Sequence, residues 1–322
     1  MAADVPTGPH PPSDEPMRPT ATAALRRHLA GHSGIRSGRY APLYLSPALA
    51  VFLVFAFGPA IFVLYISFFQ WNLLEPSLSH FIGVANYQTL FASPAFWHSA
   101  LISAYFVVAS VVLSTVAGLG LALLLLRQRT LHKVVRLAVF SPYFTPIVAT
   151  SIVWVWIFNP QFGLLDALLK IVHLPAVGWL ESVTWAMPAI LLYTMWHDIG
   201  FTVIIFLAGL AAVSVELREA ARVDGASALR ETWHVVLPQI TGTLLFVIVI
   251  TTVNSLQAFT QFYTMTGGGP VNATTTTGYL VYQNAFVFYN TGYGAAMAVV
   301  LFIVIALVSL SQFWLLRRRT PA

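Results

Sequence analysis

Three polar side chains stand inside a long apolar stretch of this sequence, residues 187–210: Tyr193, His197 and Asp198. An ionisable group at membrane depth is energetically costly, so its presence indicates either a partner or a water-filled path. One interpretation is that Asp198 pairs with His197, or with another subunit, and holds a helix bundle together. The other places these side chains on a solute path, where a lone carboxylate would also suit proton coupling.

Three amides form a second polar group: Asn254, Gln257 and Gln261. Their spacing of three and four residues predicts that they share one face of a helix. These amides have the same two possible roles: they form hydrogen bonds between helices, or they line the solute path. On a path, amides suit a hydroxyl-rich neutral solute, because they donate and accept hydrogen bonds.

A charged solute would need other groups. A phosphate favours Arg or Lys, and none lies inside any long apolar stretch of the chain. A glycerophosphodiester with a choline head group would instead suit tryptophan rings and Asp198, by cation–π contact and ion pairing. The sequence leaves these solutes open.

The composition places both polar groups in a membrane protein. Of the 322 residues, 58% are hydrophobic and only 8% are charged, and the mean hydropathy is +0.77. A soluble domain carries about 25% charged residues, so an ordinary soluble enzyme is excluded. The chain has no cysteine, which excludes disulfides, thiolate nucleophiles and cysteine-bound metals.

Six stretches are apolar and long enough, at about 20 residues each, to cross a bilayer as helices. They are residues 44–69, 101–126, 137–157, 187–210, 240–259 and 295–316. The predicted fold is therefore an all-α, polytopic membrane protein with six transmembrane helices.

The positions of the basic residues predict the orientation, because Lys and Arg in short loops stay on the cytoplasmic side. All sixteen Lys and Arg except Lys170 precede the first stretch, follow the sixth, or lie between the second and third or the fourth and fifth. Both termini are therefore expected in the cytoplasm. The net charge of +5 reflects this topology, so no nucleic-acid partner is expected. Residues 1–40 are expected to be a largely disordered tail, and 41–322 one membrane domain.

The predicted cytoplasmic loop, residues 211–238, contains closely spaced acidic and small residues. They are Glu219, Ala220, Ala221, Asp224 and Gly225. This pattern predicts two short helices that meet at Gly225, which can adopt a positive φ angle, with Asp224 hydrogen-bonding the backbone of the turn. The alanines keep the loop slim, so that the backbone of a partner can approach closely. A solvated hairpin that only joins two spans is the alternative.

Three segments of this loop resemble the EAA motif of permease subunits in binding-protein-dependent ABC importers. They are Glu219-Ala220-Ala221, Asp224-Gly225-Ala226 and Leu237-Pro238. The family usually has phenylalanine at the position of Thr232, and the nearest aromatic residue here is Trp233. A further segment, TGGGP at 266–270, looks like the loop between spans five and six of sugar and glycerol-3-phosphate permeases that form one half of a heterodimeric pair.

The resemblance implies a subunit of an ATP-driven importer in a bacterial inner membrane. The implied solute is a sugar or a glycerophosphate-type molecule, sn-glycerol-3-phosphate or a glycerophosphodiester. The implied partners are a second homologous permease, two ABC ATPase subunits and an extracytoplasmic solute-binding protein. Residues 219–225 would be the coupling helix that docks on an ATPase. ATP and Mg would bind to the ATPase subunits, because this sequence has no P-loop.

Two other classes of protein are weighed against the importer. A proton-coupled secondary transporter would use Asp198, but such transporters usually show internal repeats or paired ionisable groups, and no convincing repeat relates the two halves of this chain. An intramembrane protease is suggested only by Gly225-Ala226-Ser227-Ala228, in a charged loop without a nearby membrane-embedded His. Neither a catalytic residue nor a metal ligand is expected on this chain.

Overall fold

The computed structural model describes residues 41–126 and 130–317, and most of them are helical. The chain divides into two units, residues 1–59 and 60–322. The predicted tail, residues 1–40, lies outside the described residues.

The described part of the first unit is a helix interrupted by one wider turn. It comprises α2 (Ala41–Phe52), the π-helical turn η1 (Leu53–Phe57) and the beginning of α3 (Gly58–Ile66). The π turn precedes Pro59, whose ring would collide with the carbonyl four residues earlier in a regular helix. The backbone therefore widens, and the N–H of Gly58 donates to the carbonyl of Leu53.

The second unit holds the other elements. Its helices are α4 (Ala85–Ala92), α5 (Pro94–Leu125), α6 (Thr130–Phe140), α7 (Ile147–Ile157), α8 (Leu164–Ile171), α9 (Ala186–Ala211), α10 (Val215–Val223), α11 (Ala228–Glu231), α12 (Leu237–Gln239), α13 (Thr241–Leu256), α14 (Thr260–Met265), α15 (Thr277–Tyr282) and α16 (Thr291–Arg317). Short turns of other helix types are η2 (Pro76–Leu78), η3 (Ser141–Phe144), η4 (Thr232–Val236) and η5 (Gln283–Val287). One small hairpin departs from the all-α prediction, with β1 (Phe69–Gln70) antiparallel to β2 (His80–Phe81).

The long helices confirm a helical membrane protein. Four are long and apolar enough to cross a membrane: the helix Tyr44–Ile66, α5, α9 and α16 without its last residues. The predicted third and fifth spans are bent pairs, His132–Phe144 with α7 at 106° and Ala228–Gln239 with α13 at 75°. Pro142 and Pro146 lie at the first bend, where neither can supply the N–H that continues a helix. By length and composition, the described residues thus hold four candidate spans, or up to six if each bent pair is one span.

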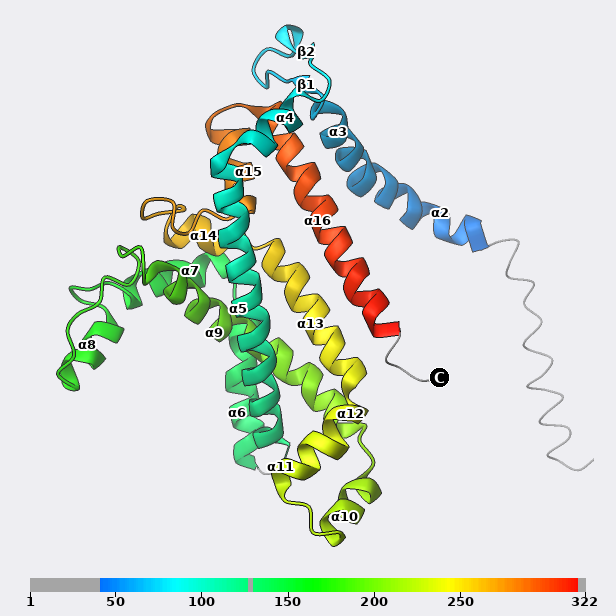
Figure 1. Cartoon of the computed structure of the whole chain (residues 1–322), viewed down its shortest axis with the longest axis vertical. Helices are drawn as coiled ribbons and strands as arrows, with labels where there is room; N and C mark the ends of the chain where they lie inside the picture. The colour runs from blue at the N-terminus through cyan, green and yellow to red at the C-terminus, as the bar shows by residue number, and fades with distance from the viewer. Residues whose placement is uncertain (1–40, 127–129, 318–322) are drawn as a thin grey trace, which may run out of the picture. The chain divides into compact units, whose positions relative to one another are not determined.

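The core of the second unit lies where α5, α9 and α13 pack together (Figure 1). Small residues line the buried face of α5: Ser99, Ser103, Ser110, Ser114, Gly118 and Ala122. Small residues let helix backbones approach closely. At Gly118, a Cβ atom would lie 2.5 Å from the methyl carbon of Thr202 on α9, so this crossing needs glycine.

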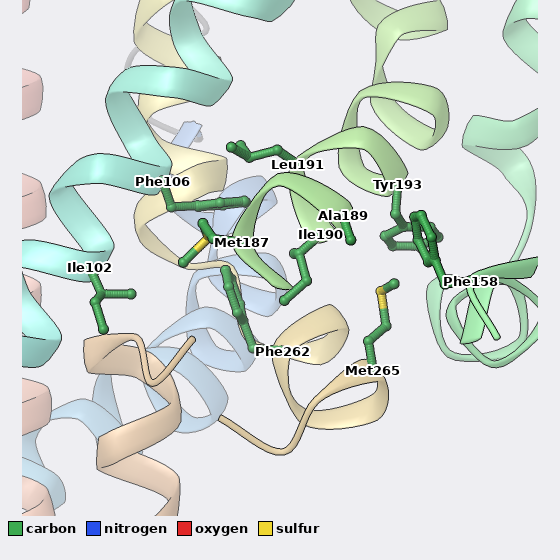
Figure 2. Packing of buried hydrophobic residues seen from close by; sticks show 10 residues of the cluster. All are labelled: Ile102, Phe106, Phe158, Met187, Ala189, Ile190, Leu191, Tyr193, Phe262 and Met265. Carbon is green, nitrogen blue, oxygen red and sulfur yellow. The ribbon is translucent and has the colours of Figure 1, made fainter. Parts of the chain in front are cut away.

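Helix α14 is attached to the same bundle through aromatic packing (Figure 2). The rings of Phe106 on α5 and Phe262 on α14 meet edge to face, with centroids 4.8 Å apart. Figure 2 also shows Met187 and Ile190 of α9 in this cluster with Met265 of α14. At opposite ends of the second unit lie the β1–β2 hairpin with α4, called the hairpin end, and α10 with α11 (Figure 1).

Candidate functional site

The loop that resembles the EAA motif, residues 211–238, forms a helical hairpin and is called the EAA loop. Both of its first helices begin at serine caps. The Oγ of Ser214 accepts a hydrogen bond from the N–H of Leu217, and the Oγ of Ser227 accepts one from the N–H of Arg230, each at 3.4 Å. A capping hydroxyl satisfies a donor that the first helical turn leaves free. The sequence therefore defines where α10 and α11 begin.

The turn between these helices confirms the prediction at Gly225, whose φ angle is +79°. The N–H of Ala226 donates to the carbonyl of Ala221 at 2.9 Å, and the N–H of Gly225 donates to that of Arg222 at 3.0 Å. These are the two hydrogen bonds of a Schellman motif. The predicted hydrogen bond from the turn to Asp224 is wrong, because the backbone closes the turn and the carboxylate accepts no hydrogen bond from any described residue.

Two arginines of α10 hold a buried carboxylate of α11. The Nε of Arg218 lies 2.7 Å from Oε1 of Glu231, and the Nε of Arg222 lies 2.8 Å from its Oε2. Hydrogen bonds from Arg222 and then Arg218 hold the pKa of the Glu231 carboxyl below its usual 4.5, because they stabilise the charged form. The sequence analysis missed this contact. Its only local signal is the spacing of four residues, which puts both arginines on one face of α10.

Both ends of the EAA loop are anchored in the core. Val213 precedes α10, and Val236 and Ile240 follow α11, and all three are buried in one cluster with Phe206 of α9 and Val247 of α13. A loop fixed at both ends to two bundle helices cannot shift as a rigid body without moving them. The EAA loop is therefore mechanically connected to α9 and α13.

The outer surface of the EAA loop carries uncovered apolar side chains. Val223 is 87% exposed, Leu229 is 70% exposed and Trp233 is 62% exposed. Of the predicted coupling residues, Glu219, Ala220, Asp224 and Gly225 are exposed and Ala221 is half-buried. Thr232, at the position where phenylalanine was expected, is half-buried and donates its hydroxyl to the carbonyl of Ala228 at 2.8 Å. Apolar groups gathered on such a surface indicate a protein contact.

The predicted pair of His197 and Asp198 forms inside the bundle. The Nδ1 of His197 lies 2.6 Å from Oδ1 of Asp198, and its Nε2 lies 3.2 Å from the carbonyl oxygen of Thr145. Both ring nitrogens of His197 therefore face oxygen atoms, one on its neighbour in the chain and one on the segment before α7.

Tyr193 is buried and forms hydrogen bonds to a neighbouring helix. Its hydroxyl donates to the carbonyl of Ile147 at 2.9 Å and lies 2.9 Å from the hydroxyl of Thr150. The side chain is fully buried. It therefore joins α9 to α7, as the bundle-holding interpretation expected.

The prediction that three amides share one helical face is wrong. Helix α13 ends at Leu256, with Gln257 as its C-cap, and the backbone of Phe259 has left helical geometry, with φ at −135°. Gln261 lies on the separate helix α14 and is only 4% exposed, whereas Asn254 and Gln257 are exposed. The sequence predicted one continuous helix here because the apolar pattern continues through the break and contains no information on chain direction.

A small cavity joins the two predicted polar groups. Asp198 of α9 and Asn254 of α13 both line it, and its volume is about 30 Å³. The rest of its polar lining consists of hydroxyl groups, those of Ser110, Ser114, Tyr143, Thr194, Thr202, Thr251 and Ser255. The Oγ of Ser110 is buried without a hydrogen-bond partner among the described residues. The space suffices for a water molecule that would satisfy it.

An apolar helix bundle with a polar cavity inside, and with a hairpin that exposes apolar side chains at one end, fits the class of membrane transport subunits. Residues 110–321 match the family described as binding-protein-dependent transport system inner membrane component. The chain belongs to this family, which confirms the resemblance seen in the EAA motif. It is a non-catalytic permease subunit of the ABC sugar importer family.

Individual relatives cover most of the chain. The sulfoquinovosyl glycerol transport system permease protein SmoG of Agrobacterium fabrum is 32% identical, over 81% of this chain and 85% of its own length. The sn-glycerol-3-phosphate transport system permease protein UgpA of Brucella abortus is 30% identical, over 85% of this chain and 94% of its own. The crystal structure of a bacterial ABC transporter for the acidic polysaccharide alginate has the same fold, with a TM-score of 0.78 at 24% identity, over 88% of this chain and 98% of that one.

Proposed function

We propose that this chain is one half of the membrane domain of an ATP-driven importer in the cytoplasmic membrane of a bacterium. It has six transmembrane helices, and both termini lie in the cytoplasm. Each bent helix pair supports this count if it crosses the membrane once. The gathering of basic residues on the side of the EAA loop supports the orientation.

The complete importer contains a second, homologous permease, two ABC ATPase subunits and an extracytoplasmic solute-binding protein. The family, which is described as binding-protein-dependent, supports the last of these partners. ATP and Mg bind to the ATPase subunits, since this chain contains no P-loop. The exposed apolar surface of the EAA loop supports a partner at that end of the bundle.

The EAA loop is the coupling element of this importer. One observation carries this proposal. Val223 is exposed at the end of α10, and the ion pair between Arg222 and Glu231 fixes this end of the helix to α11. Residues Glu219, Ala220, Ala221, Asp224 and Gly225 dock on an ATPase. When the ATPase subunits close, the loop moves as one body and carries the ends of α9 and α13 with it, which opens or closes the path between the permeases.

The solute is a sugar or a glycerophosphate-type molecule. The hydroxyl-lined cavity at Asp198 and Asn254 supports a path for polyhydroxylated solutes, and Gln257 is exposed at the end of α13. His197 orients Asp198, and Tyr193 and Gln261 support the path from buried positions. No Lys or Arg lies in the predicted spans, so the phosphate of sn-glycerol-3-phosphate or of a glycerophosphodiester would be met by the partner permease.

Reconstituted transport tests the proposal. The chain, purified with its co-purifying subunits, is placed in liposomes, and uptake is measured with internal ATP and the solute-binding protein. Val223→Glu puts a charge on the docking surface and is expected to abolish ATP-driven uptake, whereas Val223→Ala, the matched control, keeps most of it. Uptake by the chain alone, driven by a proton gradient without ATP, would instead identify a secondary transporter that uses Asp198.

A further inference from the structure

A large hollow of about 1070 Å³ lies at the hairpin end of the second unit. Its walls come from the β1–β2 hairpin with η2, from α4, and from the junction between η5 and α16 (Figure 1). Small-molecule sites measure roughly 300–1,000 Å³, so the hollow has room for a ligand with more than one ring. It is separate from the cavity at Asp198, with which it shares no lining residue.

The lining combines aromatic rings with neutral amides. The aromatic residues are Trp71, His80, Tyr289 and Tyr293, and the amides are Gln70, Asn72, Asn86, Asn284 and Asn290. None of the described lining residues is Asp, Glu, Lys or Arg. This chemistry disfavours an ionic ligand, which would leave water without a compensating charge. It favours a ligand with apolar ring faces and many hydroxyl groups.

Three of the amides are held in place by the backbone and keep one hydrogen-bonding group free. The Oδ1 of Asn72 accepts two backbone N–H groups, both at 3.0 Å, which leaves its NH₂ as a donor. The Nδ2 of Asn86 donates to two carbonyls at 2.8 and 3.0 Å, and that of Asn284 donates to one at 2.9 Å, which leaves two Oδ1 acceptors. Fixed donors and acceptors bind a hydroxyl-rich ligand at little entropic cost.

The walls of the hollow are joined tightly. A Cβ atom at Gly292, on the first turn of α16, would collide with the carbonyl oxygen of Phe69 on β1. At the rim, Tyr289 has a φ angle of +57°, which is uncommon for a bulky residue. Such conformations persist where the surrounding structure enforces them, and they gather at ligand sites.

We propose that this hollow is a second carbohydrate-binding site, specific for a neutral oligosaccharide or glycosyl polyol of two or more rings. Trp71 provides a ring face for stacking, and Asn72, Asn284 and Asn290 bond the ligand's hydroxyl groups. This proposal depends on the proposed function only for the location of the site, because in the proposed orientation the hairpin end faces the outside of the cell. There it holds solute next to the entrance of the importer.

Binding to the permease in its native complex, without the solute-binding protein, tests the site. The probes are trehalose, a neutral disaccharide, and sn-glycerol 3-phosphate, an anion, each titrated by saturation-transfer NMR. Trehalose is expected to bind and the anion is not. Trp71→Ala is expected to weaken trehalose binding about tenfold. Asn290→Ala, at an exposed amide that makes no side-chain hydrogen bond to a described residue, is expected to weaken it about threefold without disturbing the fold.

Trp97→Ala is the matched control, because Trp97 is exposed near the same end but does not line the hollow. It should leave trehalose binding unchanged. The proposal is overturned if trehalose does not bind, or if neither Trp71→Ala nor Asn290→Ala weakens it. In a separate pull-down with the solute-binding protein, loss of docking in Trp71→Ala with no change in trehalose binding would also overturn it, since the hollow is then a protein interface. In each of these cases, ATP-driven uptake by the unmodified importer would still support the proposed function.

Discussion

The Nε of Arg222 lies 2.8 Å from Oε2 of Glu231, so the last turn of α10 is joined to α11 across the turn at Gly225. The Glu231 side chain is only 5% exposed, while that of Arg222 is 58% exposed. The carboxylate is thus covered by the guanidinium groups that neutralise it. This contact, which no residue of the predicted coupling set makes, gives the EAA loop its rigidity.

Removing the charge of Glu231 should loosen the loop. Glu231→Gln keeps the shape of the side chain but loses the charge-assisted hydrogen bonds to Arg218 and Arg222, which solvent screens in part because both arginines are partly exposed. Hydrogen exchange of the α10 amides is expected to speed up about tenfold, which corresponds to about 1.4 kcal/mol. Glu216→Gln is the control, because Glu216 is exposed and its carboxylate bonds the Ser214 hydroxyl and its own backbone rather than an arginine. Equal exchange in both variants would contradict the role of Glu231.

The same contact predicts a pH dependence. Because the folded-state pKa of Glu231 is lowered, its stabilisation is complete above the usual value of 4.5 and is lost as the pH falls through the lower, folded-state pKa. A spin label at Val223→Cys, on the exposed end of α10, should stay constrained from pH 7 to about 5 and become mobile under more acidic conditions. With Glu231→Gln added, mobility should be high and independent of pH. A transition at neutral pH would assign it to another group.

Within the chain, the fold needs Gly225 because of its backbone conformation. The absence of a side chain at this position matters only for the approach of a partner. Nothing lies within 4 Å of a Cβ built there, but its φ angle of +79° is unfavourable for other residues. Gly225→Ala should cost about 1–2 kcal/mol, and Gly225→Asn less, without steric overlap. Gly225→Arg should add a block to ATPase docking. Pull-down of the ATPase should therefore fail with Arg and persist with Asn, and equal binding of both variants would contradict docking at this turn.

The absence of cysteine makes the proposed orientation directly measurable. Ser77→Cys in η2 and Ala228→Cys in α11 each place one thiol on an exposed residue at opposite ends of the second unit (Figure 1). In intact cells or right-side-out vesicles, an impermeant maleimide is expected to label position 77 only. Labelling of position 228 should appear after the membrane is permeabilised. The reverse pattern would invert the topology.

Asp198 distinguishes transport driven by ATP from transport driven by protons. Asp198→Asn keeps an oxygen for the hydrogen bond with His197, but it removes the acidic group from a side chain that is 44% exposed. ATP-driven solute uptake should fall about tenfold through loss of one hydrogen bond between this side chain and the solute, and its dependence on ATP should persist. Glu181→Gln, an exposed carboxylate outside the bundle, is the control. Loss of a gradient-driven, ATP-independent uptake in Asp198→Asn would favour a proton-coupled carrier.

Much of the fold was predictable because it depends on local properties. Apolar length predicted the membrane helices, and Asp224, Gly225 and the neighbouring alanines predicted a helical hairpin in the EAA loop. The contact between His197 and Asp198 joins neighbours in the chain, so it too was within reach of the sequence. The break at residues 257–259 was not, because apolar composition continues through a change of chain direction.

The sequence by itself determined that this chain is a helical membrane protein of the permease family with an EAA loop, because composition, motif spacing and caps are properties of contiguous residues. Only the tertiary structure decided that Glu231 secures the loop, that Asp198 and Asn254 meet in one cavity, and that Gln261 is buried on another helix. These relationships join residues from different helices. They depend on how closely the helices pack, which is set by small residues such as Gly118 together with their partners on the facing helix.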